Sequence, residues 1–141
     1  MKRVFLDATC WMAAAGSEAG GSSAIILLAQ SLLLTLAASQ VVLQEAERNI
    51  RAKMGSEAIQ RLYALLANTK IEMCEPTTLE EEEQWAGLTA EKDRHVLAAA
   101  FKANAGVLVT LDRKHVLTDA VRCGFPIPVQ DTKEFLTAFR G

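Results

Sequence analysis

Two short stretches, VFLDATCW (residues 4–11) and VLVTLDRKH (residues 107–115), give the clearest indication of the fold class of this chain. In each of them a run of apolar residues leads into an aspartate, Asp7 in the first and Asp112 in the second. The runs VFL and VLVTL are continuously apolar rather than alternating, which is typical of strands buried on both faces of a parallel sheet. We therefore expect a parallel sheet covered by helices on both sides.

Predicted strands and helices alternate along the rest of the chain. Strands are expected at residues 3–6, 32–37, 70–74, 107–111 and 127–129. Helices are expected at residues 9–15, 22–31, 39 to the glycine at 55, 56–68, 93–104 and 131–140, and one more begins at Thr78. Such alternation is typical of an α/β fold, and no repeat, low-complexity tract or linker divides the chain. We expect one domain over residues 1–141.

The two strand-terminal aspartates, Asp7 and Asp112, indicate where a site would lie. If both strands are parallel, both carboxylates emerge at the carboxyl edge of the sheet, where α/β folds of this kind bind ligands. The alternative is that each aspartate only caps the helix that follows it. For either residue taken alone, helix capping is the better interpretation.

Two further acidic residues lie on predicted helices near the apolar faces. Glu45 follows Val41 and Val42 by four and three residues, so it shares much of the helix face that these residues bury. Asp93 lies in the first turn of its helix, above an inward-facing apolar stripe. A favourable interaction with the helix dipole explains Asp93, but it does not explain Glu45.

Four carboxylates near one another need a counter-charge. An unpaired buried carboxylate is costly, and neighbouring carboxylates repel each other. A divalent cation would resolve both problems at once. The acidic residues therefore predict a metal site formed by Asp7, Glu45, Asp93 and Asp112.

Four segments in order resemble the successive signatures of PIN domains: VFLDATCW, SQVVLQEAERNI (39–50), KDRHVLAAAFKANAGVLVTLDRKH (92–115) and FPIPVQDTKEFL (125–136). The resemblance is strongest to the branch that includes VapC-like toxins and other toxin components of toxin–antitoxin pairs. Each segment alone is a weak signal, whereas the four together, at suitable spacings over nearly the whole chain, are fairly specific.

The resemblance implies a Rossmann-like three-layer α/β/α sandwich with a mostly parallel central sheet. It also implies an endoribonuclease that depends on Mg²⁺ or Mn²⁺, often a homodimer held by an antitoxin protein. Cleavage would leave a 5′-phosphate and a 3′-hydroxyl. Carried over by position, the acidic quartet is Asp7, Glu45, Asp93 and Asp112, and the supporting hydroxyl residues are Thr9 and Thr110.

The quartet suits this chemistry, because oxygen ligands without Cys or His favour Mg²⁺ or Mn²⁺ over zinc. We assign the three aspartates of the quartet mainly to metal binding. Glu45 is expected to orient or deprotonate the attacking water.

One departure from the family follows Asp112. Many relatives have another acidic or amide residue a few positions later, but here Arg113, Lys114 and His115 follow, which leaves a second metal position open. His115 could touch substrate, but a structural role is the better interpretation for it, and His95 is expected to be structural or exposed.

Several basic residues lie within one or two helical turns of the acidic residues in sequence. They are candidates for binding RNA phosphates, although a solvated charged face is an equally good interpretation for each: Arg48, Arg51, Arg94, Arg113 and Lys114. The net charge of −2 gives no basic surplus, which weakens a nucleic-acid interpretation without excluding it. The run Glu80–Glu83 is expected to be a solvated helix start rather than a second metal site.

The three cysteines, Cys10, Cys74 and Cys123, form no Cys-x-x-Cys pair and predict neither a disulfide framework nor a zinc site. We expect reduced, mostly buried thiols in a cytoplasmic protein. The apolar stretch at residues 24–43 has the length of a membrane span, but polar residues interrupt it and no basic residue flanks it closely. A buried helix followed by a buried strand is the preferred interpretation.

Two other functions compete with the nuclease. An Asp-dependent phosphatase or receiver-type domain also has an aspartate after its first strand, but Asp7-Ala8-Thr9 lacks the second acid of a phosphatase and no late lysine marks a receiver. The other alternative is a PIN-like scaffold that binds RNA or protein without cutting. The intact quartet argues against that scaffold but does not demonstrate turnover.

Overall fold

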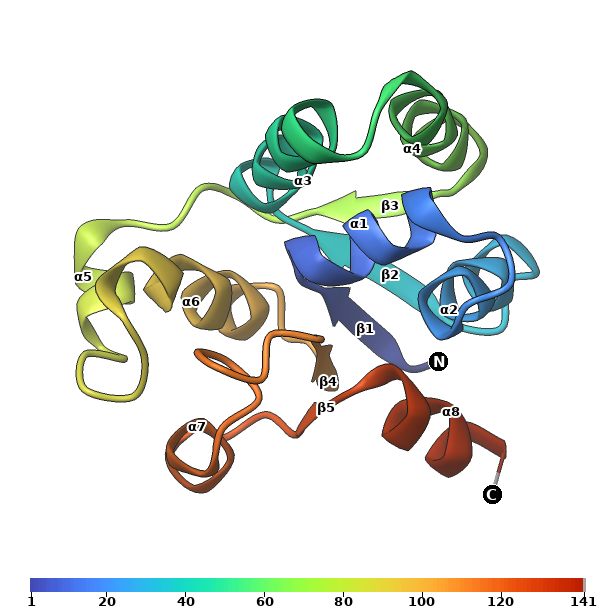
Figure 1. The fold of residues 1–141 in the computed structure, drawn as a ribbon. Helices are drawn as coiled ribbons and strands as arrows, with labels where there is room; N and C mark the ends of the chain where they lie inside the picture. Colours follow the sequence, from blue (N-terminus) through green and yellow to red (C-terminus); the bar gives the residue numbers. More distant parts are fainter. Residues whose placement is uncertain (141) are drawn as a thin grey trace.

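The computed structural model describes residues 1–140 and contains a parallel five-stranded sheet (Figure 1). The strands, in the order β3-β2-β1-β4-β5 across the sheet, are β1 (Arg3–Leu6), β2 (Thr35–Ala38), β3 (Ile71–Met73), β4 (Val107–Val109) and β5 (Val129–Gln130). All four pairings are parallel, and Phe5 lies in register with Ala37 on one side and Leu108 on the other. The expected parallel α/β fold is confirmed.

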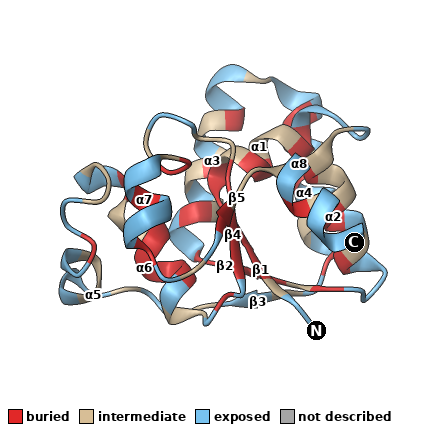
Figure 2. Cartoon of the chain, turned by 90° about the horizontal axis from the view of Figure 1, so that it is seen from below, coloured by how far each residue is buried: buried red, intermediate tan, exposed pale blue. Residues whose placement is uncertain are grey.

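The helices are α1 (Ala8–Gly16), α2 (Gly21–Gln30), α3 (Gln40–Lys53), α4 (Ser56–Asn68), α5 (Leu79–Glu83), α6 (Arg94–Lys102), α7 (Asp119–Gly124) and α8 (Thr132–Arg140). A short 3₁₀ helix, η1 (Glu91–Asp93), precedes α6. Figure 2 shows α6 and α7 on one side of β1 and β4, and α2, α4 and α8 on the other. The sheet is therefore the middle layer of an α/β/α sandwich.

The central strands are buried on both faces, as their continuous apolar runs predicted. Every residue of β4 and the last three of β1 are buried, and Trp11, Phe5 and Phe135 are the largest side chains that are almost fully enclosed. Trp85 is also buried and packs edge-on against Phe125, with ring centroids 4.9 Å apart. Both tryptophans are thus packing residues.

The prediction of a strand at residues 32–37 is wrong for residues 32–34, because β2 begins only at Thr35. Leu32 has φ of 61°, and it lies 68% exposed between α2 and β2. The amide of Leu32 donates to the Ala29 carbonyl and the amide of Leu33 to the Leu28 carbonyl, the bond pattern of a Schellman motif. A leucine occupies the left-handed position that glycine usually takes, so the sequence carried no signal for this turn.

Other boundaries differ by smaller amounts. The helix α7 was not expected; it begins where the Thr118 hydroxyl accepts from the amide of Val121. The helix from Thr78 does begin with the expected capping box, in which Thr78 and Glu81 exchange hydrogen bonds. Cys123 is exposed, so the expectation of mostly buried thiols holds for Cys10 but is wrong for Cys123.

The apolar stretch at residues 24–43 is divided among α2, β2 and the start of α3. Within residues 1–140, no single helix is both long and apolar enough to cross a membrane. The helices α1 and α2 would satisfy the length and composition criteria together, but they are bent by 96° at the break between them.

Candidate active site

Asp7 follows β1 directly and lies at the carboxyl edge of the sheet. Its amide donates to the Val109 carbonyl over 3.1 Å, which joins the ends of β1 and β4. Its Oδ1 accepts from the amide and the hydroxyl of Thr9, and its Oδ2 accepts from the hydroxyl of Thr110 over 2.5 Å. Asp7 therefore caps α1, as the capping interpretation expected, but its side chain also receives a bond from Thr110, the residue that follows β4.

The two threonine hydroxyls also bind the loop after β4. The Thr9 oxygen accepts from the Leu111 amide and the Thr110 oxygen from the Asp112 amide, each over 3.0 Å. A hydroxyl has a single proton, and in both residues it is directed at the Asp7 carboxylate. This network fixes Asp7 and the backbone at Asp112 relative to each other.

The Asp7 carboxyl group is only 3% exposed, and its burial raises its pKa above the usual value of 3.8. The hydroxyl and amide bonds from Thr9 and Thr110 act in the opposite direction but do not cancel the effect of burial, and the charge of Asp112 adds to the rise. A nearby cation would favour the ionised form of this carboxyl group.

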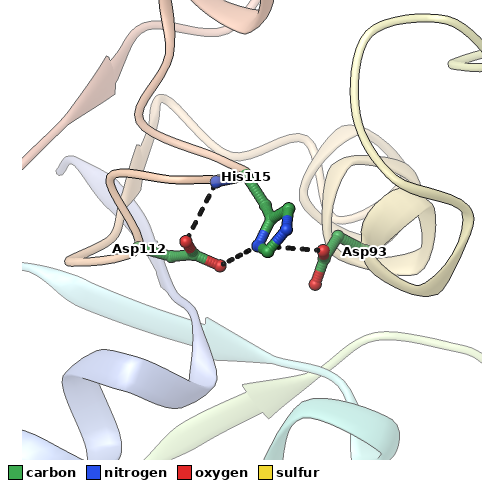
Figure 3. A group of neighbouring side chains, drawn as sticks. All are labelled: Asp93, Asp112 and His115. Atoms are coloured by element: carbon green, nitrogen blue, oxygen red, sulfur yellow. Dashed lines mark hydrogen bonds and ion pairs between the residues drawn. The ribbon is translucent and has the colours of Figure 1, made fainter.

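Asp112 lies in the turn that follows β4. Its Oδ1 accepts from the amides of Lys114 and His115, over 3.1 and 3.0 Å. Its Oδ2 takes no part in these bonds and faces the His115 imidazole, with 3.6 Å between Oδ2 and Nδ1 (Figure 3). The local turn thus occupies one oxygen of Asp112 and orients the other toward the site.

Asp93 is the last residue of η1 and immediately precedes α6. Its side chain is only 8% exposed and makes no capping hydrogen bond to the helix. Its Oδ2 lies 3.1 Å from Nζ of Lys92, whose own side chain is 68% exposed, and 3.8 Å from Nδ1 of His115. A side-chain cap therefore does not account for this buried carboxylate.

Asp93, Asp112 and His115 each direct one atom into a common space. These three ligand atoms all lie within 4.8 Å of one another (Figure 3). The sequence favoured a structural role for His115, and the only signal that could have found it is its position three residues after Asp112. Asp7 is next to this group, through its bond to Thr110, without being part of it.

Glu45 lies on α3 at the border of the helix's buried face, because the buried positions are Val42, Ala46 and Ile50. Its side chain is 31% exposed, so it is less buried than its sequence position indicated. Its Oε1 lies 3.4 Å from Nε2 of His95, and this contact is the main reason that the pKa of Glu45 is lowered.

Glu45 and Asp93 line one hollow of about 320 Å³ together with Arg48, Lys92 and His95. The charges of Arg48 and Lys92 also lower the pKa of Glu45. The fourth acidic residue therefore faces the same side of the molecule as Asp93, although it is outside the group of three ligand atoms. Lys92 was not among the basic residues singled out in the sequence.

The basic residues proposed from the sequence differ in whether an acidic side chain pairs with them. Arg94 lies 3.6 Å from Glu83, and Arg113 lies 2.9 Å from Asp131. Arg51 contacts the hydroxyl of Tyr63 and lies 3.9 Å from Glu47. Over residues 1–140, no ion pair holds the exposed side chains of Arg48 and Lys114, which leaves them available to another anion.

The residues at this edge suit a small divalent cation. They offer carboxylate oxygens and one imidazole nitrogen, and among residues 1–140 the only lysine or arginine paired with the buried Asp93 is Lys92, whose side chain lies largely in solvent. Two metal ligands at about 2.0–2.2 Å from one ion, separated by angles of about 90–120°, are roughly 2.8–3.8 Å apart. The distances of 3.6 and 3.8 Å from His115 to the two aspartates fall within this range.

Solved structures share the fold at low sequence identity. PAE2754 from Pyrobaculum aerophilum is 17% identical with a TM-score of 0.66, and the match covers 99% of this chain and 96% of that one. VapBC2 from Rickettsia felis, solved with a DNA fragment from its promoter, is 20% identical with a TM-score of 0.62, covering 92% and 98%. VapC20 from Mycobacterium tuberculosis, described as a sarcin–ricin loop cleaving toxin, is 19% identical with a TM-score of 0.57, covering 86% and 95%.

No curated protein matches the chain. The family model for the PIN domain matches residues 3–114, which include β1 through β4 and all four acidic residues of the site. This chain therefore belongs to the PIN domain family.

Proposed function

We propose that this protein is a metal-dependent endoribonuclease that hydrolyses RNA phosphodiester bonds at the carboxyl edge of the sheet. The observation that carries the proposal is the convergence of Asp93 Oδ2 and Asp112 Oδ2, beside an Asp7 carboxylate fixed by two hydroxyls. Each acid comes from a different segment, so their meeting is a product of the fold and not of local sequence. Membership of the PIN domain family supports the same conclusion.

Asp93 and Asp112 would hold Mg²⁺ or Mn²⁺ directly, since carboxylate oxygens suit both ions, and Asp7 beside them would add its negative charge to the metal site. When bound, the ion would lower the pKa of a water ligand and neutralise charge on the phosphoryl oxygens. Asp112 is oriented for this role by the two amides on its Oδ1, and Asp7 by the hydroxyls of Thr9 and Thr110.

Glu45 would orient the attacking water and accept its proton. Glu45 is ionised at neutral pH and can act as an acceptor, although its lowered pKa makes it a weaker base than an ordinary glutamate. The water oxygen would form a bond to phosphorus while the bond from phosphorus to the 3′ oxygen breaks, and the leaving oxygen would take up a proton from solvent water. The products would carry a 5′-phosphate and a 3′-hydroxyl.

The basic side chains of the rim would bind the RNA backbone. Arg48 and Lys92 line the hollow beside Glu45 and Asp93, and Lys114 follows Asp112 by two residues. Arg48 and Lys92 thus lie near Glu45 and Asp93, and Lys114 lies near Asp112 in the chain, so each part of the acidic site has a basic side chain that could contact a phosphate. Arg51, Arg94 and Arg113 would contribute less, because each already faces an acidic side chain.

We propose further that the protein is the toxin of a toxin–antitoxin pair, active as a homodimer in the cytoplasm and held by an antitoxin protein. The support is the fold shared with VapC20, a described toxin, and with VapBC2. A short upstream reading frame with a DNA-binding pattern would agree with this assignment. Growth arrest on induced expression of the wild type, but not of Asp112→Asn, would test it.

The experiment that tests the nuclease is cleavage of RNA with Mn²⁺ or Mg²⁺, compared with the same reaction in excess chelator. Asp112→Asn should abolish cleavage, whereas Asp119→Asn should retain it. Asp119 is an exposed aspartate in the first turn of α7, so its variant makes the same chemical change away from the site. RNA that is bound by the wild type but never cut would instead support a non-catalytic RNA-binding module.

A further inference from the structure

His115 presents its Nδ1 atom between two carboxylates that come from different parts of the chain. Nδ1 lies 3.6 Å from Oδ2 of Asp112 and 3.8 Å from Oδ2 of Asp93, both longer than a hydrogen bond. The ring is positioned by its backbone, since the His115 amide donates to Asp112 Oδ1 and its carbonyl accepts from the Thr89 hydroxyl. The imidazole is thus held over the gap between the two acids (Figure 3).

Few hydrogen-bond donors reach the three facing atoms, which are Oδ2 of Asp93, Oδ2 of Asp112 and Nδ1 of His115. Both carboxylate oxygens are acceptors, and Nδ1 of a neutral imidazole protonated at Nε2 is an acceptor as well. Among residues 1–140, the only donor that reaches any of the three atoms is the Lys92 ammonium, which contacts Asp93 Oδ2 and has a side chain that is 68% exposed. The three acceptors therefore repel one another, unless a cation lies between them or the ring carries a second proton. The distances fit ligands around one ion better than hydrogen bonds from a protonated ring to either acid.

We propose that His115 is a nitrogen ligand that joins Asp93 and Asp112 around one divalent cation, and that it makes the site prefer Mn²⁺ over Mg²⁺. This inference rests on the proposed metal-dependent function and deepens it by naming the ion. Carboxylate-only sites suit Mg²⁺ and Mn²⁺ alike, whereas imidazole favours first-row transition metals. His115 therefore supplies a nitrogen ligand at a position where Mg²⁺ would prefer an oxygen ligand.

The direct test is pulsed electron paramagnetic resonance of Mn²⁺ bound to the full-length protein. A coordinated imidazole nitrogen modulates the electron spin echo, and replacing ¹⁴N by ¹⁵N in labelled histidine changes that modulation. The chain contains only two histidines, so His115→Ala and His95→Gln assign the signal to one ring. His95 is the matched control, because it contacts Glu45 rather than the two aspartates.

We expect nitrogen modulation in the wild type and in His95→Gln, and none in His115→Ala. Two results would contradict the assignment of His115 as a ligand without contradicting the proposed nuclease function. One is nitrogen modulation that persists in His115→Ala. The other is a wild-type protein that binds Mn²⁺ and cleaves RNA but shows no nitrogen modulation. If the wild type takes up no Mn²⁺ and cleaves no RNA under any divalent ion, the proposed function fails as well.

Ion affinity provides an independent test that does not depend on turnover. Even the loss of a residue that only supports a metal ligand costs about ten- to a hundredfold in affinity. Calorimetric titration should therefore show that His115→Ala lowers Mn²⁺ affinity by at least about tenfold, with a smaller loss for Mg²⁺. His115→Asn keeps a polar side chain at this position and should also lack the modulation. This second variant shows that the loss in His115→Ala does not result from misfolding. His115→Asp should shift the preference toward Mg²⁺. Equal losses for both ions in His115→Ala would contradict the proposed preference.

Discussion

The hydroxyl of Thr110 donates to Oδ2 of Asp7, although the two residues lie 103 positions apart in the sequence. The same hydroxyl oxygen accepts from the amide of Asp112, and the side chain of Thr110 is completely buried. One hydroxyl therefore fixes two acids of the site relative to each other, and the bond joins the residue that follows β4 to the residue that follows β1.

Replacing Thr110 by valine tests this connection, because valine has nearly the same shape and no hydroxyl. The Asp112 amide and the Asp7 carboxylate each lose a partner, so we expect a loss of about 1–3 kcal/mol in the free energy of unfolding. RNA cleavage should fall as well, since the two acids are no longer fixed. Thr110→Ser keeps the hydroxyl and should retain most of both properties in urea denaturation and cleavage assays.

Asp93→Asn and Asp112→Asn should separate metal binding from structure. Without metal, both variants should match or exceed the melting temperature of the wild type, because each removes a charge from a crowded acidic site. In Asp112→Asn the side-chain amide oxygen can still accept from the amides of Lys114 and His115. The ion pair lost in Asp93→Asn involves an exposed lysine and is therefore worth little.

With Mn²⁺ present at a hundred times its dissociation constant, the wild type should gain about 2.7 kcal/mol of stability by mass action. Both variants should lose this gain together with RNase activity. Melting curves with and without Mn²⁺ measure this gain in stability. If both variants show the same Mn²⁺-induced gain as the wild type, these aspartates do not bind the metal ion.

The raised pKa of Asp7 predicts how the stability of the metal-free protein depends on pH. The folded state binds the Asp7 proton more tightly than the unfolded state, whose pKa is about 3.8. Between this value and the raised pKa, the folded state holds more protons, so this group's contribution to stability falls as pH rises. Acidic groups with lowered pKa values, such as Glu45 and Asp131, act in the opposite direction.

The comparison of wild type with Asp7→Asn isolates this contribution. Urea denaturation in chelator should show that the variant gains stability relative to the wild type as pH rises from about 4 toward neutrality. A difference that stays constant across this range would mean that the Asp7 pKa is not raised in the folded protein.

The apolar runs that end at Asp7 and Asp112 were sufficient to predict the parallel sheet and the edge at which both acids lie. Burial on both faces leaves a strong and local signature in the sequence. The turn at Leu32 was not predicted, because a left-handed backbone conformation is normally expected at glycine. The hydrogen bonds at the end of α2 hold Leu32 in this conformation, although leucine rarely adopts it.

The position of His115 could not be predicted for a different reason. Its spacing from Asp112 is visible in the sequence, but its distance to Asp93 depends on how α6 packs beside the loop after β4. The pairing of Glu45 with His95 likewise joins α3 to α6, and no residue pattern reports a contact between two helices so far apart in the chain.

RNA binding should depend on the free basic side chains more than on the paired ones. Arg48→Ala and Lys114→Ala should each weaken binding to any single-stranded sequence and reduce the slope of log K against log salt by about 0.7 per lost phosphate contact. Arg51→Ala is the control, because Arg51 already contacts Tyr63 and Glu47. Fluorescence anisotropy with an uncleaved RNA over a salt series measures the slopes, and equal slopes in all three variants would contradict this assignment.

Glu45→Gln should distinguish a residue that acts on water from one that holds the ion. Glu45 is outside the group formed by Asp93, Asp112 and His115, so the variant should keep most of the stabilisation by Mn²⁺. Loss of a general base lowers the rate by about 10²- to 10⁴-fold, and we expect kcat to fall within this range with little change in KM.

Glu47→Gln is the matched control, because Glu47 lies two residues away on the same helix and contacts Tyr63 instead of the acidic site. It should cleave RNA at the wild-type rate. If Glu45→Gln instead abolishes the Mn²⁺-induced rise in melting temperature, Glu45 binds the ion directly and the role of proton acceptor passes to another group.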